Sequence, residues 1–414
     1  MAPMETHALQ EREFGDGVRP EFPIFEREIQ GRPPALFDGP GGSQVPRAVI
    51  EAVSLYYRHS NANTHGAFVT SRETDAVLEE VRQACAAFLR APGWETISFG
   101  ANMTTLAFFL ARALGRMLRA GDEILVTQLD HEANRGPWLQ LRELGLIVRE
   151  VAMTPGGHLD YDDFAAKLTE RTRITAVGWA SNALGTVNNL TWIRERTRRV
   201  GSLLVVDAVH YAPHFSINVR TLDPDFLLCS AYKFYGPHVG ILYGRPNLLG
   251  QLPTDRLSVQ DCRAPWRIET GTLNHAAIAG VGAAIRFLSE FGEGPDLRSR
   301  IEQTFSRLER YENRLARRLW TGLAGIPSVQ LYGPDFEEGQ RAPTIAFRVR
   351  HLSPQAVAER LAEQGIFVWD GDFYAARAIE LLGLAQRGGV VRAGVSMYTT
   401  EEDVDRLLEA VDDL

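Results

Sequence analysis

Two apolar stretches are the most informative part of this sequence: Leu203-Leu-Val-Val-Asp-Ala-Val-His210 and Phe226-Leu-Leu-Cys-Ser-Ala-Tyr-Lys-Phe-Tyr-Gly-Pro237. Each is an apolar run of strand length that ends in polar residues. The carboxyl ends of parallel strands form the ligand-binding edge of an α/β sheet. Asp207 and Lys233 are therefore expected to share one pocket.

Apolar runs alternate with helical patterns on both sides of these stretches. We predict buried strands at residues 96–99, 123–127, 147–151, 174–179, 203–206 and 226–229, and helices at 104–119, 134–144, 161–170 and 191–200. This rhythm is typical of an α/β fold whose doubly wound, mainly parallel sheet carries helices on both faces.

The pattern changes after about Gly294, where a long charged helix at 296–323 leads into a smaller α+β domain. Its predicted strands are 329–332, 344–349 and 366–369, with helices at 354–363 and 401–411. A chain of 414 residues is long enough for two domains. We expect an N-terminal arm at 1–35 that joins the small domain, a large domain at 36–294 and a small domain at 295–414. The glycine-rich segment 39–43 is expected to be a flexible loop or a close-approach site.

Composition narrows the classes of partner. The formal net charge of −8 argues against binding to nucleic acid or to an anionic membrane. The three cysteines are widely spaced and form no C-x-x-C pair, so no disulfide framework and no metal site is expected. Residues 1–30 lack the features of a signal peptide, and no apolar run reaches the roughly 18 residues of a membrane span. These features predict a cytoplasmic protein that acts on small molecules.

The 44 basic residues include only two lysines, Lys167 and Lys233. Lys167 lies on a helical pattern whose polar face should be solvated. Chemistry that uses pyridoxal 5′-phosphate (PLP) needs a lysine amine to bond the cofactor and a carboxylate to keep the pyridine nitrogen protonated. Lys233 and Asp207 meet this need. Taken singly, a surface lysine and a strand-end cap would explain them, but their positions at the ends of adjacent strands favour the cofactor pair.

The segment from Ser230 to Gly244 resembles the cofactor-lysine signature of class V aminotransferases, in particular the branch of cysteine desulfurases and selenocysteine lyases. Segments 38–46, 61–68 and 392–398 resemble that family's N-terminal loop, its histidine-containing substrate loop and its carboxylate-binding strand. The resemblance spans nearly the whole chain. It implies the PLP-dependent transferase fold of type I, with PLP as the cofactor.

The resemblance assigns roles around the cofactor ring. It implies that His131 stacks on the ring and acts in catalysis with Lys233 and Asp207. It places Asn182 near the phenolic oxygen of the ring. His210 occupies a position where the family has a glutamine that hydrogen-bonds this oxygen, and histidine can do the same.

The phosphate is expected at the amino end of the helix that begins near Ala101, where free N–H groups and the helix dipole favour an anion. We assign Ala101, through its backbone, and Asn102 to this site, with hydroxyls from Ser230 and Tyr232. Thr272 matches a family threonine that reaches the phosphate of the partner subunit. The resemblance therefore implies a homodimer with shared active sites.

On the substrate side, Arg392 is expected to bind the α-carboxylate of an amino acid, because a guanidinium matches a carboxylate with two hydrogen bonds. A structural salt bridge is the alternative for this residue. His65 is expected to close over the substrate from its loop.

Tyr374 stands where the resemblance places the catalytic cysteine of desulfurases, and none of the three cysteines is positioned to replace it. Trp369 and Asp370 depart from the same family segment. We therefore expect a desulfurase-like lyase that cleaves a C–S or other Cβ–X bond without a persulfide cysteine. A PLP-dependent epimerase, an aminotransferase and a non-catalytic PLP-binding protein remain as alternatives.

Overall fold

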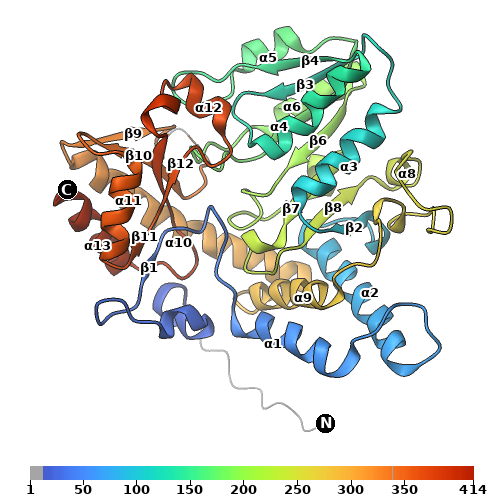
Figure 1. The fold of residues 1–414 in the computed structure, drawn as a ribbon, viewed down its shortest axis with the longest axis horizontal. Helices are drawn as coiled ribbons and strands as arrows, with labels where there is room; N and C mark the ends of the chain where they lie inside the picture. The colour runs from blue at the N-terminus through green and yellow to red at the C-terminus, as the bar shows by residue number, and fades with distance from the viewer. Residues whose placement is uncertain (1–12, 338) are drawn as a thin grey trace.

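A computed structural model describes residues 13–337 and 339–414, so the first 12 residues of the predicted N-terminal arm lie outside it. Its centre is a seven-stranded sheet in the order β2-β8-β7-β6-β5-β3-β4 (Figure 1). The strands are β2 (Ile97–Gly100), β3 (Glu123–Thr127), β4 (Ile147–Val151), β5 (Thr172–Gly178), β6 (Leu203–Asp207), β7 (Phe226–Ser230) and β8 (Gly240–Gly244). Only β8 runs antiparallel to its neighbours β2 and β7. The mainly parallel sheet is as predicted.

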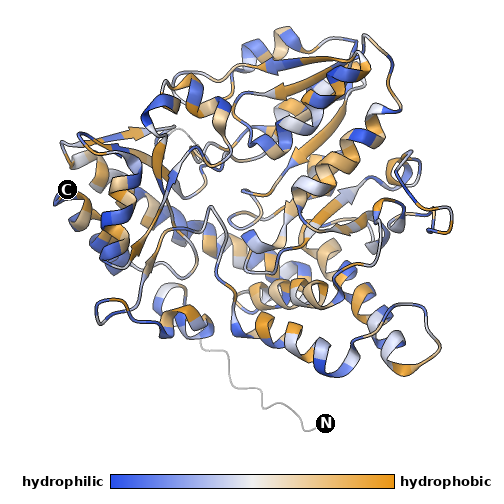
Figure 2. Cartoon of the chain, in the orientation of Figure 1, coloured by the Kyte–Doolittle hydropathy of each residue, from blue (hydrophilic) through white to orange (hydrophobic). Residues whose placement is uncertain are grey.

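Alternate residues of each strand enter different apolar cores, as the two-residue period of a strand requires. Leu204 and Val206 belong to one core, whereas Val205 belongs to the other. The strands are therefore apolar on both faces, and Figure 2 shows hydrophobic colouring along much of the large sheet. Helices that contribute to the first core are α2 (Val69–Leu89), α5 (Tyr161–Lys167), α6 (Leu190–Val200), α7 (Val219–Leu222) and α9 (His275–Ser289); the second core is covered by α3 (Met103–Gly115), α4 (Glu132–Gln140) and α8 (Pro246–Leu249).

A second, antiparallel sheet follows in the order β12-β13-β10-β9. Its strands are β9 (Val329–Tyr332), β10 (Thr344–Val349), β12 (Trp369–Gly371) and β13 (Val390–Gly394). The remaining helices are α1 (Arg47–Leu55), which packs on α9, and α11 (Pro354–Glu363), α12 (Ala376–Leu381) and α13 (Glu401–Asp412) around the second sheet. The described part of the chain holds no helix that is both long enough and apolar enough to cross a membrane.

The 29-residue helix α10 (Leu297–Gly325) joins the two halves of the molecule. Ile301 and Phe305 in its first half pack in the core of the large sheet. Leu315 and Leu319 in its second half pack in the core of the small sheet. One helix is therefore shared by both cores, and the domain boundary at residue 295 stays a prediction.

Two local predictions need correction, and for a third segment the structure decides between the two alternatives. The predicted strand 366–369 is divided into β11 (Ile366–Phe367), which pairs with β1 (Ala35–Leu36), and β12, which pairs with β13. The helix expected to begin near Ala101 begins at Met103, because the Asn102 side chain caps it by accepting a hydrogen bond from the Thr105 N–H. The glycine-rich segment 39–43 is a hydrogen-bonded turn, and a Cβ at Gly41 would overlap the indole of Trp369. The turn is thus a close-approach site.

Candidate active site

Three neighbouring parallel strands end together at one edge of the large sheet. Gly178 at the end of β5 is in register with Asp207 at the end of β6, and β7 ends beside them at Ser230. A cavity of about 600 Å³ opens at this edge. Its lining includes most of the predicted site residues, namely Asn102, His131, Asn182, Asp207, His210, Ser230, Tyr232 and Lys233.

Lys233 ends a short 3-10 turn directly after β7 and is 9% exposed. Its Nζ donates a hydrogen bond to the Pro40 carbonyl in the glycine-rich turn. Burial and the positive charge of Arg392 lower the pKa of Lys233 to about 7, although Asp207 acts in the opposite direction. A substantial fraction of this amine is therefore neutral at pH 7 and able to act as a nucleophile.

Asp207 accepts a hydrogen bond from the Val209 N–H at 2.9 Å. Burial raises its pKa to about 6, against the effects of that hydrogen bond and of Lys233. A second buried carboxyl, Asp130, accepts the Gly178 N–H at 2.8 Å, and burial raises the pKa of Asp130 to about 7. Both carboxyls therefore hold a proton more tightly than an exposed aspartate does.

His131 is the N-cap of α4, where its Nδ1 accepts the Ala133 N–H at 3.0 Å. That bond leaves the proton of a neutral ring on Nε2. Burial, with the charges of Lys233 and Arg392, lowers the pKa of His131 to about 4. The ring is therefore neutral at pH 7, which suits packing against another planar ring.

Asn188 Oδ1 in the cavity wall is a buried atom without a partner in the described part of the chain, and two further polar side chains of the wall carry one such atom each. Asn182 donates through Nδ2 to the Phe373 carbonyl at 2.9 Å, and its Oδ1 has no partner. His210 contacts Thr344 Oγ1 through Nε2 at 2.9 Å, and its Nδ1 has no partner. Unsatisfied buried polar atoms are costly, so these two are consistent with a polar ligand in the cavity.

The amino end of α3 lines the same cavity through Asn102, Met103, Thr104 and Thr105. The Met103 N–H donates to Ser230 Oγ at 3.0 Å, which ties the helix to the end of β7. Ala101 is exposed and is not part of the lining. Met103, Thr104 and Thr105 were not among the predicted phosphate contacts, because that prediction placed the start of the helix near Ala101.

Arg392 on β13 is 3% exposed. Its Nη1 donates to the Asn182 carbonyl at 3.1 Å, and its guanidinium lies 4.0 Å from the centre of the Phe373 ring. Among the described residues no carboxylate forms an ion pair with it, although Asp38 acts on it electrostatically. The alternative of a structural salt bridge is therefore not observed. Burial lowers the pKa of Arg392 to about 9, so it is cationic at pH 7.

The turn at residues 372–375 is fastened to the cavity wall. The Tyr374 carbonyl accepts the Glu132 N–H at 2.7 Å, and the Tyr374 N–H donates to Asp372 Oδ1 at 2.9 Å. Phe373 and Tyr374 both have positive φ angles, near +56° and +57°. The Tyr374 ring lies 5.5 Å from the His131 ring and is 72% exposed, outside the lining of the cavity.

Three other residues lie away from this cavity in the same chain. Thr272 lines a separate surface hollow with Tyr56 and Asn63. His65 is exposed and contacts Asp75 Oδ1 through Nδ1 at 3.3 Å. Lys167 is not simply solvated, because its Nζ donates to the Glu150 carbonyl at 2.6 Å and pairs with Asp163 at 2.7 Å.

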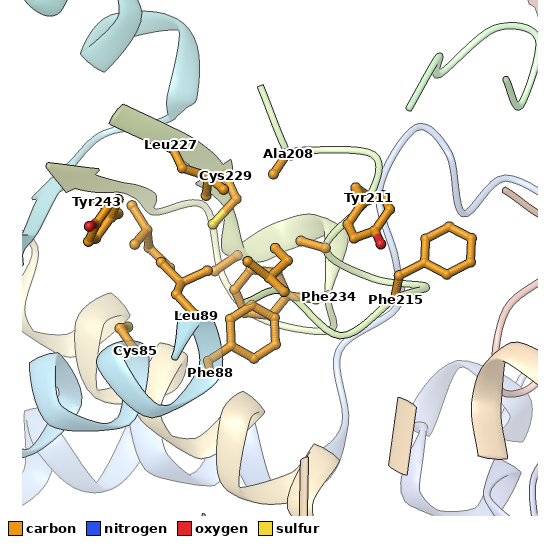
Figure 3. Packing of buried hydrophobic residues seen from close by; sticks show 14 of the residues in the cluster. Cys85, Phe88, Leu89, Ala208, Tyr211, Phe215, Leu227, Cys229, Phe234 and Tyr243 are labelled. Atoms are coloured by element: carbon orange, nitrogen blue, oxygen red, sulfur yellow. The ribbon is translucent and has the colours of Figure 1, made fainter. Parts of the chain in front are cut away.

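The three cysteines are also outside the cavity lining of the described chain. Cys85 on α2 and Cys229 on β7 point into the large core (Figure 3). Burial raises the pKa of Cys85 to about 12 and that of Cys229 well above its usual range, so both are protonated at pH 7. Cys262 is exposed.

Comparison with known proteins identifies the family of this chain. The profile of the family described as Aminotransferase class-V matches residues 35–407. The chain belongs to the class-V aminotransferase family. It is 34% identical over 409 residues to a cysteine desulfurase of Yersinia pestis (strain Pestoides F), with 94% of this chain and 96% of that protein covered. It is 32% identical to a cysteine desulfurase of Pectobacterium carotovorum subsp. carotovorum (strain PC1), with 94% and 95% covered.

Solved structures of the family share the fold. The apo cysteine desulfurase of Thermococcus onnurineus NA1 superposes with a TM-score of 0.87 at 29% identity, covering 100% of this chain and 99% of that one. The cysteine desulfurase CsdA of Escherichia coli, in its S-sulfonic acid form, gives a TM-score of 0.83 at 28% identity, with 96% and 97% covered. The predicted family, the type I fold and a PLP-dependent enzyme are thereby confirmed.

Proposed function

We propose that this class-V enzyme is a lyase that cleaves the Cβ–S bond of a cysteine conjugate, or another Cβ–X bond, without a persulfide cysteine. The observation that carries the proposal is a cavity with Lys233 and Asp207 at adjacent strand ends, a buried unpaired Arg392 beside it and no cysteine in its lining. Bound PLP would supply the electron sink for loss of the α-proton.

Each residue would have a distinct task in that reaction. Lys233 would hold the cofactor and move the α-proton, since the pKa of its amine is near 7. Asp207 would hold a proton at the pyridine nitrogen, and the neutral His131 would pack on the ring. Asn182 and His210 would bind the phenolic oxygen through the atoms that lack partners.

The phosphate would be bound at the start of α3. Asn102, Ser230 and Tyr232 would contribute polar side chains. The first turn of the helix, which includes Thr104 and Thr105, would contribute the positive end of the helix dipole. The exposed Ala101 is the weakest of the predicted contacts.

The substrate would be held by Arg392, which needs an anionic partner. Loss of the α-proton and of the thiolate would leave an unsaturated amine that water converts to pyruvate and ammonia. Tyr374 would lie nearest the leaving group in place of the desulfurase cysteine, and its phenol could supply the proton that converts thiolate to thiol.

A homodimer in the cytoplasm is part of the same proposal. Thr272, and His65 from the neighbouring loop, would approach the active site of the partner, since neither lies in the cavity of its own chain. The amino acid substrate would enter the active site from solvent, and neither a nucleic acid nor a membrane would take part.

Anaerobic incubation of the purified holoenzyme with L-cysteine and a panel of cysteine S-conjugates tests the proposal. Equal amounts of thiol, pyruvate and ammonia are expected, and Cys262→Ser should leave the rate unchanged. A protein-bound sulfur that cyanide releases as thiocyanate would instead show a persulfide enzyme.

The same incubation separates the alternatives. α-Proton exchange with inversion and no thiol would identify an epimerase, and amino transfer to a keto acid would identify an aminotransferase. Borohydride reduction and peptide mapping should place the cofactor on Lys233, with Lys167→Ala as the matched control. A protein that takes up no PLP on Lys233 would contradict the proposal outright.

A further inference from the structure

The contact between His210 and Thr344 joins the cofactor cavity to the C-terminal sheet. His210 follows β6 in the large sheet, whereas Thr344 is the first residue of β10. Both side chains are buried, and Thr344 is fully so. The Nε2–Oγ1 distance is 2.9 Å. Residues 134 positions apart thus meet at the cavity wall.

Thr344 is held firmly in this position. Its carbonyl accepts a hydrogen bond from Arg341 Nη2 at 2.9 Å, and its N–H donates to the Ala342 carbonyl at 2.7 Å. Its Cα is paired with Gly394 on β13. The backbone therefore fixes where the hydroxyl lies.

The charge state of His210 follows from its surroundings. Burial holds the pKa of His210 well below its usual value, and the positive charges of Lys233 and Arg392 act in the same direction. The ring is neutral at pH 7, so only one of its nitrogens carries a proton.

The hydroxyl decides which nitrogen this is. Among the described residues, His210 Nε2 is the hydrogen-bond partner found for Thr344 Oγ1. If Nε2 donated to Oγ1, the buried hydroxyl hydrogen would have no acceptor, which is unfavourable. If Oγ1 donates to Nε2, the hydroxyl hydrogen is satisfied and the ring proton must reside on Nδ1. Nδ1 is the ring nitrogen without a partner in a residue that lines the cavity.

We propose that Thr344 is a positioning residue that fixes His210 as the Nδ1–H tautomer, so that the imidazole presents a hydrogen-bond donor to the cofactor cavity. The matching ligand atom is a hydrogen-bond acceptor. This inference rests on the proposed PLP site, whose phenolic oxygen is of that kind. A residue of the C-terminal sheet would then influence the pH at which the bound cofactor loses its proton.

The test compares Thr344→Val, Thr344→Ser and wild type as holoenzymes, by titrating the visible absorbance of the bound cofactor with pH. Valine cannot donate to Nε2, so the protein no longer holds the ring as the Nδ1–H tautomer, and the hydrogen bond from Nδ1 to the phenolate should weaken. We expect the titration midpoint to rise by ~0.5–1 unit in the valine variant, the effect of about one hydrogen bond. Serine keeps the hydroxyl and should titrate like wild type.

Equal midpoints in the valine variant and wild type, or equal shifts in valine and serine, would overturn the assignment. Neither outcome bears on the proposed lyase, because PLP attachment and product formation are measured separately. If the valine variant does not fold, ¹⁵N-histidine NMR of the wild-type protein still decides. The His210 signals, identified by their loss in His210→Gln, should show a protonated Nδ1; a protonated Nε2 would refute the proposal.

Discussion

Lys233 can react only when its amine is unprotonated. Its surroundings lower the pKa of the amine, so that this form is present near pH 7. Burial and Arg392 lower its pKa to about 7 from the ordinary lysine value of 10.5. The rate of PLP attachment to the apoprotein should therefore rise with pH, with a midpoint near 7 and a plateau above about pH 8. Asp207 acts to raise this pKa, so Asp207→Asn should move the midpoint to lower pH. A rate that still climbs between pH 9 and 10 would show an ordinary lysine.

Arg392 is the residue that we expect to bind the negatively charged carboxylate of the substrate. Arg392→Lys keeps the charge but loses the two-pronged geometry. We expect kcat/KM for a cysteine S-conjugate to fall ~10- to 100-fold, the loss of about 1.5–3 kcal/mol for a charged hydrogen bond. The corresponding cysteamine conjugate, which lacks the carboxylate, is the control and should lose little. Equal losses for both compounds would mean that Arg392 is structural.

At the scale of elements, the turn at 372–375 is held by short-range contacts that can be removed singly. Asp372→Ala removes the acceptor for the Tyr374 N–H, whereas Asp372→Asn keeps an acceptor oxygen. Amide hydrogen exchange at residues 372–375 should become ~2- to 10-fold faster in the alanine variant, from about 0.5–1.5 kcal/mol of lost hydrogen bonding. The asparagine variant should resemble wild type. Equal exchange in both variants would show that Phe373 and the Tyr374 carbonyl alone hold the turn.

The elements also show what the sequence could predict. Lys233, Asp207 and His131 follow buried strands, and strand ends of a parallel sheet converge, so their meeting was predictable. Thr344 and Phe373 reach the site from the C-terminal part, and no local pattern marks them. The helix α9 was not predicted, because it is buried on nearly all sides and lacks an apolar stripe. The divided strand at 366–371 follows from tertiary pairing with β1 and β13.

At the scale of the whole molecule, the proposed sharing of sites can be tested by mixing two inactive variants. Lys233→Ala lacks the cofactor lysine, and Thr272→Ala lacks the residue proposed to reach the partner. In a mixed dimer, one site would have Lys233 from one chain and Thr272 from the other. We expect activity to reappear after the two are unfolded and refolded together. Activity no greater than the sum of the separate variants would contradict shared sites.

The helix α10 has a consequence for recombining this protein with its relatives. Ile301 and Phe305 fit the large core, and Leu315 and Leu319 fit the small one. A chimera spliced at residue 295 would set a foreign half-helix against the large core. Glu312, near the middle of the helix, still contacts His214, which follows β6 of the large sheet, at 2.8 Å. A crossover placed just after Glu312 would keep each half of the helix together with the core against which it packs.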